Sequence, residues 1–127
     1  MVNSRRKGNE AERSIVKMFR NHYGGHWERR SMGVPGADII APDSFAYAIE
    51  VKNVANLKLL HLFKGSKVLD DFWAQAVQQA KAAEKAPLLM VKIEGLWVWL
   101  NIPPSEVNDL CRVTEADYYV GDLYGKY

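Results

Sequence analysis

Asp38, Glu50 and Lys52 lie close enough in the sequence to act together. Apolar and other side chains alternate over residues 45–53, so Glu50 and Lys52 are expected to project from the same face of a strand. A turn at residues 42–44 could return this strand along the short segment that follows Asp38, bringing Asp38 near Glu50. Two carboxylates beside a lysine suit a hard divalent cation with a proton-handling group next to it.

Glu12 is a further candidate, because it lies on an expected helix over residues 9–23 that two glycines would end. In a helical projection Glu12 shares one narrow stripe with Val16, Phe19 and Tyr23, which places it on the apolar face. An unpaired carboxylate there would cost several kcal/mol, so Glu12 needs a metal, a cation or an opening to a cleft. Alternatively, Glu12 only pairs with an arginine at the edge of this stripe.

Length and composition describe one ordinary globular domain. The chain has 127 residues and is 48% apolar, enough for a proper core, and we expect a single domain over residues 1–127. No apolar run could span a bilayer and no apolar signal core follows the basic start, so we expect a cytoplasmic protein without a membrane partner. The single Cys111 excludes an internal disulfide and a cysteine-based zinc site, and its apolar spacing predicts a buried structural thiol.

Charge is distributed unevenly along the chain, although the net charge is only +2. Residues 1–30 hold eight Lys and Arg against three acids, whereas residues 101–127 hold two against five. The excess of Lys and Arg in residues 1–30 could bind the phosphate backbone of a nucleic acid. Alternatively, it could belong to a solvated terminal arm. We expect residues 1–7 to form a flexible basic arm and residues 101–127 a C-terminal extension.

The other elements must carry these residues. We expect strands at residues 26–31, 39–40, 45–53, 88–93 and 96–100, and a second helix from about 68 to 85. Residues 32–36 read as a tight loop leading to Asp38, and residues 54–67 as a long loop whose mixed apolar and basic residues form a contact surface. Gln75 would lie at the edge of the inward stripe of the second helix.

The spacing of Asp38 and Glu50-Val51-Lys52 resembles the PD-(D/E)XK nuclease signature. Three further segments resemble archaeal-type Holliday junction resolvases: residues 6–13 with Glu12, Ser31 before a glycine-containing loop, and residues 87–97. The resemblance covers roughly residues 6–100 and implies an α/β fold, with a restriction-endonuclease-like core in which helices flank a central mixed β-sheet. Residues 54–67 and the acidic, tyrosine-rich tail depart from the family pattern.

The resemblance also implies roles for individual residues. Asp38, Glu50 and the Val51 carbonyl would ligate Mg²⁺ or Mn²⁺, and Glu12 would hold the same ion, or a second one, through water. Lys52 would orient or deprotonate the attacking water, and Ser31 would contact the scissile phosphate or a metal-bound water. Gln75, or alternatively Gln79, would support the site from the second helix. The residues expected to bind DNA are Arg5, Arg6, Lys7, Arg13, Arg29 and Arg30.

The function implied is a metal-dependent, structure-selective DNA endonuclease, with a homodimeric Holliday junction resolvase as the leading form. Its partners would be four-way or other branched DNA and a second copy of the chain. One alternative keeps the fold and changes the substrate, giving a nicking, repair or restriction-like nuclease. The other is a nucleic-acid-binding module without catalysis, which would have no use for carboxylates converging near phosphates.

Overall fold

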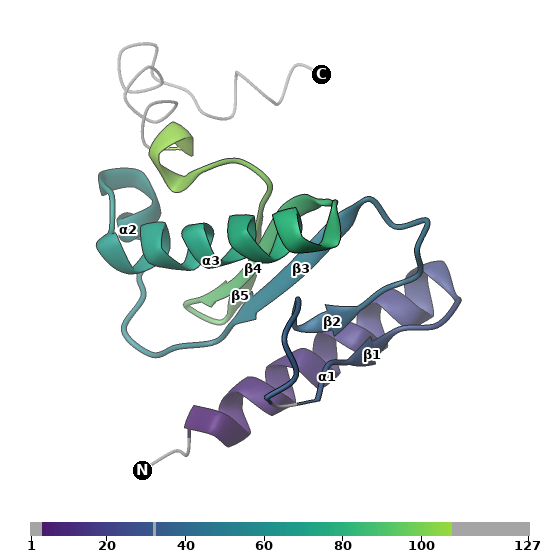
Figure 1. Ribbon diagram of the computed structural model, residues 1–127. Coiled ribbons are helices and arrows are strands. Elements are labelled where there is room, and N and C mark those ends of the chain that lie inside the picture. The colour runs from purple at the N-terminus through teal and green to yellow at the C-terminus, as the bar shows by residue number, and fades with distance from the viewer. Residues whose placement is uncertain (1–3, 32, 108–127) are drawn as a thin grey trace, which may run out of the picture.

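The computed structural model describes residues 4–31 and 33–107, which form an α/β arrangement (Figure 1). Along the chain the elements are α1 (Ser4–Tyr23), β1 (Glu28–Arg29), β2 (Ile39–Ile40), β3 (Tyr47–Lys52), α2 (Leu59–Lys64), α3 (Lys67–Ala83), β4 (Ala86–Ile93) and β5 (Leu96–Leu100). Cys111 and most of the C-terminal extension lie outside the described residues, so the expectations for them stay predictions.

The strands form two small sheets. Strand β3 pairs in parallel with β4, and β4 pairs antiparallel with β5, which gives the order β3-β4-β5. Strands β1 and β2 form a separate antiparallel pair. The hairpin ladder expected between residues 39–40 and 45–53 is therefore absent from the described sheets, because β2 pairs with β1, the strand that precedes it in the sequence. A side chain makes the connection instead, as described below.

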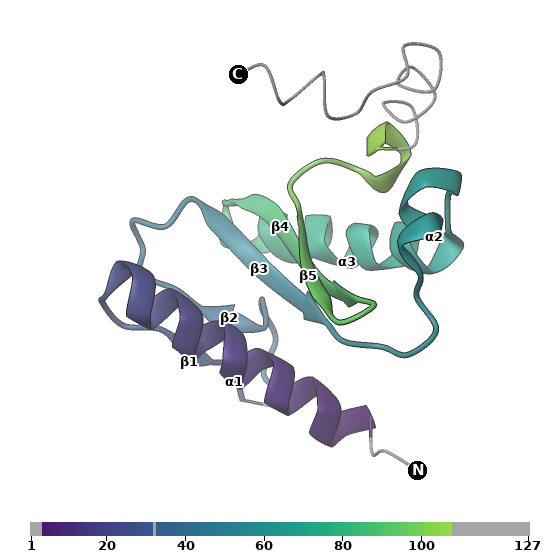
Figure 2. The same ribbon diagram turned by 180° about the vertical axis from the view of Figure 1, so that it is seen from behind.

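Helices cover both faces of the three-stranded sheet (Figures 1 and 2). Helix α1 packs on one face, where Ile15, Phe19 and Trp27 join Ile49 and Met90 in one core cluster. Helices α2 and α3 cover the opposite face in a second cluster with Leu69, Ala76, Leu89, Val91 and Ile93. Because neighbouring residues of a strand point to opposite faces, Ile49 and Val51 face α1 while Glu50 and Lys52 face α3, as the alternation predicted.

Two segments that were expected to lack regular secondary structure contain helix. Residues 4–7, predicted as part of a flexible arm, form the first turns of α1, consistent with the high helix propensity of arginine and lysine. Within the predicted loop 54–67, the structure forms α2, whose Leu62 is buried while Leu60 and Phe63 stay exposed. One buried side chain in so short a helix leaves almost no periodic signal in the sequence, which is why this helix was not predicted.

The mixed sheet packed against helices is consistent with the PD-(D/E)XK fold. Among the described residues, no helix is long and apolar enough to cross a membrane.

Candidate active site

Asp38 connects the two sheets through its side chain. Its carboxylate accepts a hydrogen bond from the backbone N–H of Val51 at 2.8 Å, and its own carbonyl accepts one from the N–H of Arg30 at 2.9 Å. The pKa of Asp38 is raised, because burial outweighs the lowering effects of the Val51 N–H and of Lys52. The Asp38 side chain thus contacts the edge of β3, although β2 and β3 form no ladder. This contact places Asp38 next to Val51, the residue that follows Glu50.

Glu50 is the buried carboxylate of the site, with only 7% of its surface exposed. Its Oε2 lies 3.8 Å from the Nζ of Lys52, and its Oε1 is buried with no hydrogen-bond partner among the described residues. Burial first, and then the negative charge of Asp38, raise the pKa of Glu50 to about 7. A buried carboxylate oxygen without a partner leaves an acceptor that a cation or a proton can satisfy.

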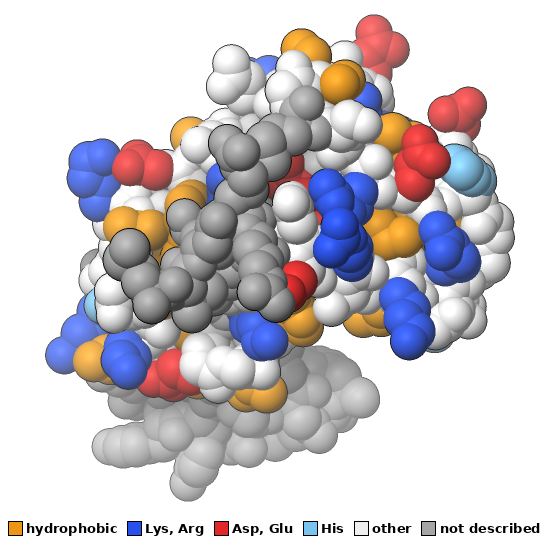
Figure 3. Space-filling model, turned by 90° about the horizontal axis from the view of Figure 1, so that it is seen from below, with side chains coloured by type: hydrophobic (Ala, Val, Ile, Leu, Met, Phe, Trp, Pro, Cys, Tyr) orange, Lys and Arg blue, Asp and Glu red, His pale blue; other side chains and the backbone are white. Residues whose placement is uncertain are grey.

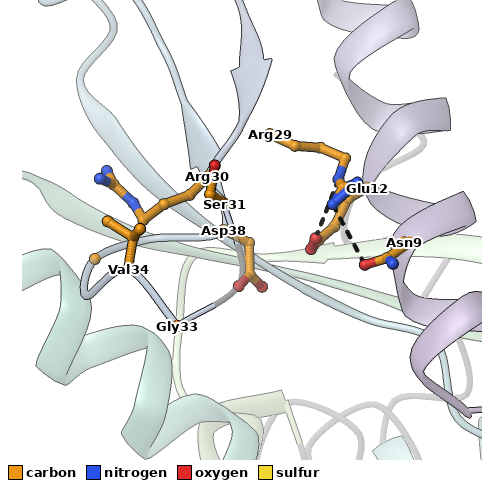
Figure 4. A pocket seen from close by; sticks show the side chains of 9 residues that line it. Asn9, Glu12, Arg29, Arg30, Ser31, Gly33, Val34 and Asp38 are labelled. Atoms are coloured by element: carbon orange, nitrogen blue, oxygen red, sulfur yellow. Dashed lines mark hydrogen bonds and ion pairs between the residues drawn. The ribbon is translucent and has the colours of Figure 1, made fainter.

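Glu12 reaches the same region from α1. Burial and the charge of Asp38 raise its pKa, and Arg29 and Lys52 oppose this rise. The Nε of Arg29 lies 3.7 Å from the Oε1 of Glu12, and one of its terminal nitrogens donates to Asn9 at 3.5 Å (Figure 4). Glu12 therefore has an arginine partner, although this is Arg29 of β1 and not an arginine at the edge of the helical stripe. Glu12 also lies within the field of Asp38.

A pocket of about 220 Å³ opens between Glu12 and Asp38. The loop after β1 forms its other wall, including Ser31, which is exposed, and Gly36. Gly36 has φ of +130°, and a Cβ there would lie 2.5 Å from the guanidinium of Arg30. The loop therefore depends on glycine at this position, and a polar ligand could enter beside both carboxylates.

Lys52 lies against an aromatic ring of α3. Its Nζ is 5.1 Å from the centroid of the Phe72 ring, a distance at which a cation is attracted to the ring face. Gln75, the predicted support, is exposed on α3, so it is Phe72 that reaches the lysine from this helix. The inward stripe is centred on Leu69, Ala76 and Ala80, which turns position 75 outward and explains the difference.

The predicted DNA-binding residues are placed in different ways. Arg13 is exposed on α1. Arg29 points toward α1 and contacts Glu12, whereas Arg30 points the other way and donates to the carbonyl of Ala37 at 2.6 Å (Figure 4). The side chains of Arg5, Arg6 and Lys7 lie outside the described set.

The donor set fits a hard divalent cation, although within residues 4–31 and 33–107 no group of three or more His, Cys, Asp or Glu is assembled as a complete metal site. Glu50 is buried and Asp38 is half-buried, and the charge of Asp38 raises the pKa of Glu50, so a positive charge between them would relieve repulsion. The unsatisfied Oε1 of Glu50 is the observation that favours a cation there. The Val51 carbonyl as a ligand stays a prediction.

A family model described as "Phage putative PDDEXK endonuclease" matches residues 3–103. The match includes the carboxylates, Lys52, the pocket loop and all five strands. No curated protein matches the chain.

Proposed function

The chain belongs to the family described as phage putative PDDEXK endonucleases, and from this membership we propose that it hydrolyses phosphodiester bonds of DNA. The proposed active site contains Asp38, Glu50 and Lys52. The observation that carries this assignment is the buried Glu50, whose Oε1 lacks a hydrogen-bond partner among the described residues while its Oε2 faces Lys52. Glu50 is buried and the charge of the half-buried Asp38 raises its pKa, which is costly to a fold. Because Asp38 also lines the pocket with Glu12, this arrangement favours a catalytic use over a structural one.

Asp38 and Glu50 would hold Mg²⁺ or Mn²⁺ together with the Val51 carbonyl, and Glu12 would take part directly or through water. When bound, such an ion supplies Lewis acidity toward the phosphodiester and makes water a better nucleophile. The N–H of Val51 holds the Asp38 carboxylate toward β3, so Asp38 keeps its place before substrate arrives.

Lys52 would orient the attacking water and offset the negative charge that develops on the phosphate oxygens. Its Nζ already lies beside Glu50 and over Phe72, which restricts where the ammonium can go. Ser31 is exposed in the pocket wall, where its hydroxyl could donate to the scissile phosphate.

For the substrate we propose four-way DNA junctions, with the protein acting as a homodimer. The support is the resemblance of residues 6–13, Ser31 and residues 87–97 to archaeal-type junction resolvases. Two symmetric cuts across a junction require two active sites, and a two-fold dimer provides them most economically.

Cleavage of three substrates with Mg²⁺ and with EDTA tests this function. We expect Mg²⁺-dependent cleavage, with paired cuts in a synthetic four-way junction and much weaker cleavage of a linear duplex and of supercoiled plasmid. Equal cleavage of all three would support the nicking, repair or restriction-like alternative. Binding of DNA without cleavage under any divalent ion would support the non-catalytic alternative and contradict the proposal.

Replacing Phe72 by Leu should slow cleavage roughly tenfold, because the apolar volume is largely kept while the ring face under the Lys52 ammonium is lost. Single-turnover rates at saturating protein measure the effect. Phe72→Tyr keeps the ring and should retain most of the parental rate. A Phe72→Leu rate equal to that of Phe72→Tyr would show that the ring does not position Lys52.

Replacing Glu12 by Gln should reduce cleavage at least about a hundredfold while the metal-free protein melts close to the parental temperature or above it. The reason is that the change removes a charge that burial and Asp38 both disfavour. Mg²⁺ should also raise the melting temperature less than in the parent. Melting curves with and without Mg²⁺, beside a single-turnover rate, decide the matter. A destabilised variant that cuts at nearly the parental rate would mean that Glu12 only balances Arg29.

A further inference from the structure

A second hollow, between α1 and β1, is lined by cations that the catalytic assignment does not use. This α1 groove, of about 530 Å³, is lined by Arg13, Lys17, Arg20, Asn21, Glu28 and Arg29, with Val16 at its base. Several Lys and Arg side chains gather on the face of the molecule on which α1 lies (Figure 3). Arg29 also lines the pocket with Glu12 and Asp38, so the two hollows share one wall.

Two cations of the α1 groove, Lys17 and Arg20, lack a neutralising acid within the helix, whereas Arg13 has Glu10 three positions before it. Lys17 has Arg13 and Arg20 at neighbouring positions on the same helical face, and such like-charged pairs each cost a few tenths of a kcal/mol. Neither Lys17 nor Arg20 has an acid three or four positions away within α1. Arg20 donates a hydrogen bond to the Trp27 carbonyl at 2.6 Å. Glu28 is the one acid among the residues that line the groove, and its Oε2 lies 3.1 Å from the Nε2 of His26. An arrangement that costs helix stability is expected where a polyanion provides the compensating charge.

The cations on the opposite side of the sheet are arranged differently. Lys67 is paired with Asp71 at 2.8 Å, and the neighbouring surface exposes Leu60, Phe63 and Val68. Lys64 and Lys81 are exposed at the ends of α2 and α3, and neither helix lines the pocket between Glu12 and Asp38. The α1 groove therefore combines clustered positive charge with a residue, Arg29, that also lines the pocket with Glu12 and Asp38.

We propose that the α1 groove binds the phosphodiester backbone of the duplex arm that leaves the active site. The proposal rests on the proposed function for the position of the cleaved bond. From Arg13 to Asn21 the helix rises about 12 Å, which corresponds to roughly three to four base pairs of duplex. The contacts are to phosphates, so they position the arm without reading its sequence.

The test is a salt titration of binding that does not depend on cleavage. The probe is a fluorescein-labelled duplex of about 30 base pairs, in EDTA, with anisotropy measured between about 50 and 300 mM KCl. Arg13→Ala combined with Lys17→Ala should weaken binding roughly tenfold and reduce the slope of log K against log salt by about two. The matched control, Lys64→Ala with Lys81→Ala, removes the same charge from exposed sites on the opposite side of the sheet and should leave affinity and slope within about twofold of the parent.

Parental affinity and slope in the Arg13 and Lys17 variant would overturn the proposal, and so would equal weakening in both variants, since net charge alone would then explain it. Both pairs lie on exposed helix faces and alanine favours helix, so unchanged melting temperatures are the check on folding. With Mg²⁺ and a four-way junction, cleavage lost at low protein should return at about tenfold higher protein. If neither the parent nor any variant cleaves DNA, but the salt titration of duplex binding gives the expected result, the proposed function fails and the groove remains a duplex-binding surface.

Discussion

Replacing Asp38 by Asn, or Glu50 by Gln, should reduce cleavage at least about a thousandfold while DNA binding is kept or slightly strengthened. Each change removes one of the two carboxylates that would hold the cation, whose Lewis acidity contributes several kcal/mol to such a reaction. Each change also removes a negative charge near the phosphates, which accounts for the expected effect on binding. Single-turnover rates at saturating Mg²⁺ and anisotropy in EDTA measure the two quantities separately.

Glu106→Gln is the matched control, because Glu106 is exposed and belongs to neither sheet. It changes net charge by the same amount and should leave the cleavage rate unchanged. Robust Mg²⁺-dependent cleavage by purified Asp38→Asn or Glu50→Gln protein would remove these residues from the active site. Loss of binding together with cleavage would instead point to an altered fold.

Glu50→Gln should also stabilise the metal-free protein, and the gain should depend on pH. The folded protein holds a proton on Glu50 up to about pH 7, whereas the unfolded chain releases it near pH 4.5. The folded state therefore binds more protons between these values, so stability falls as pH rises from about 4.5 to 7. The full shift corresponds to a loss on the order of 3 kcal/mol above pH 7. Glutamine carries no such penalty, so the stabilisation should be large at pH 8 and small at pH 4.5.

Urea denaturation in EDTA at pH 4.5, 6 and 8 measures this difference for the parent, Glu50→Gln and Glu106→Gln. The pKa values of Asp38 and Glu12 are also raised, so the parent should keep part of the pH dependence after Glu50 is replaced. The same stability difference between parent and Glu50→Gln at all three pH values would mean that Glu50 titrates in the folded protein as it does in the unfolded chain, with its pKa near the ordinary value of 4.5. The site would then lack the charge strain on which the proposed cation depends.

Simple periodicity was enough to place Glu50 and Lys52 together, because the period of a strand is two and leaves no freedom once the apolar face is identified. The same reasoning placed Glu12 toward the sheet, since Val16 and Phe19 of its stripe are buried in the core beneath α1. Tyr23, the last residue of that stripe and of α1, is 59% exposed although its ring stacks on Phe19.

Other features depend on relations between distant segments that no local pattern records. The bond from the Val51 N–H to Asp38 replaces the expected hairpin ladder, and it follows from β2 pairing with β1. Phe72 rather than Gln75 faces Lys52 because the buried stripe of α3 is centred on Leu69, Ala76 and Ala80, and position 72 lies closer to this centre than position 75 does. The position of Arg29 beside Glu12 could have been suspected only from the need of a half-buried carboxylate for a partner.

The location of a bound metal ion tests the central claim most directly. Crystals of protein that cuts DNA in the presence of Mn²⁺, soaked in Mn²⁺, would show the ion in an anomalous difference map, with Glu50→Gln crystals as the comparison. The account predicts a peak between the carboxylates of Asp38 and Glu50 that is lost or greatly weakened in Glu50→Gln. A peak elsewhere, or none at this pair in protein that cleaves with Mn²⁺, would contradict it.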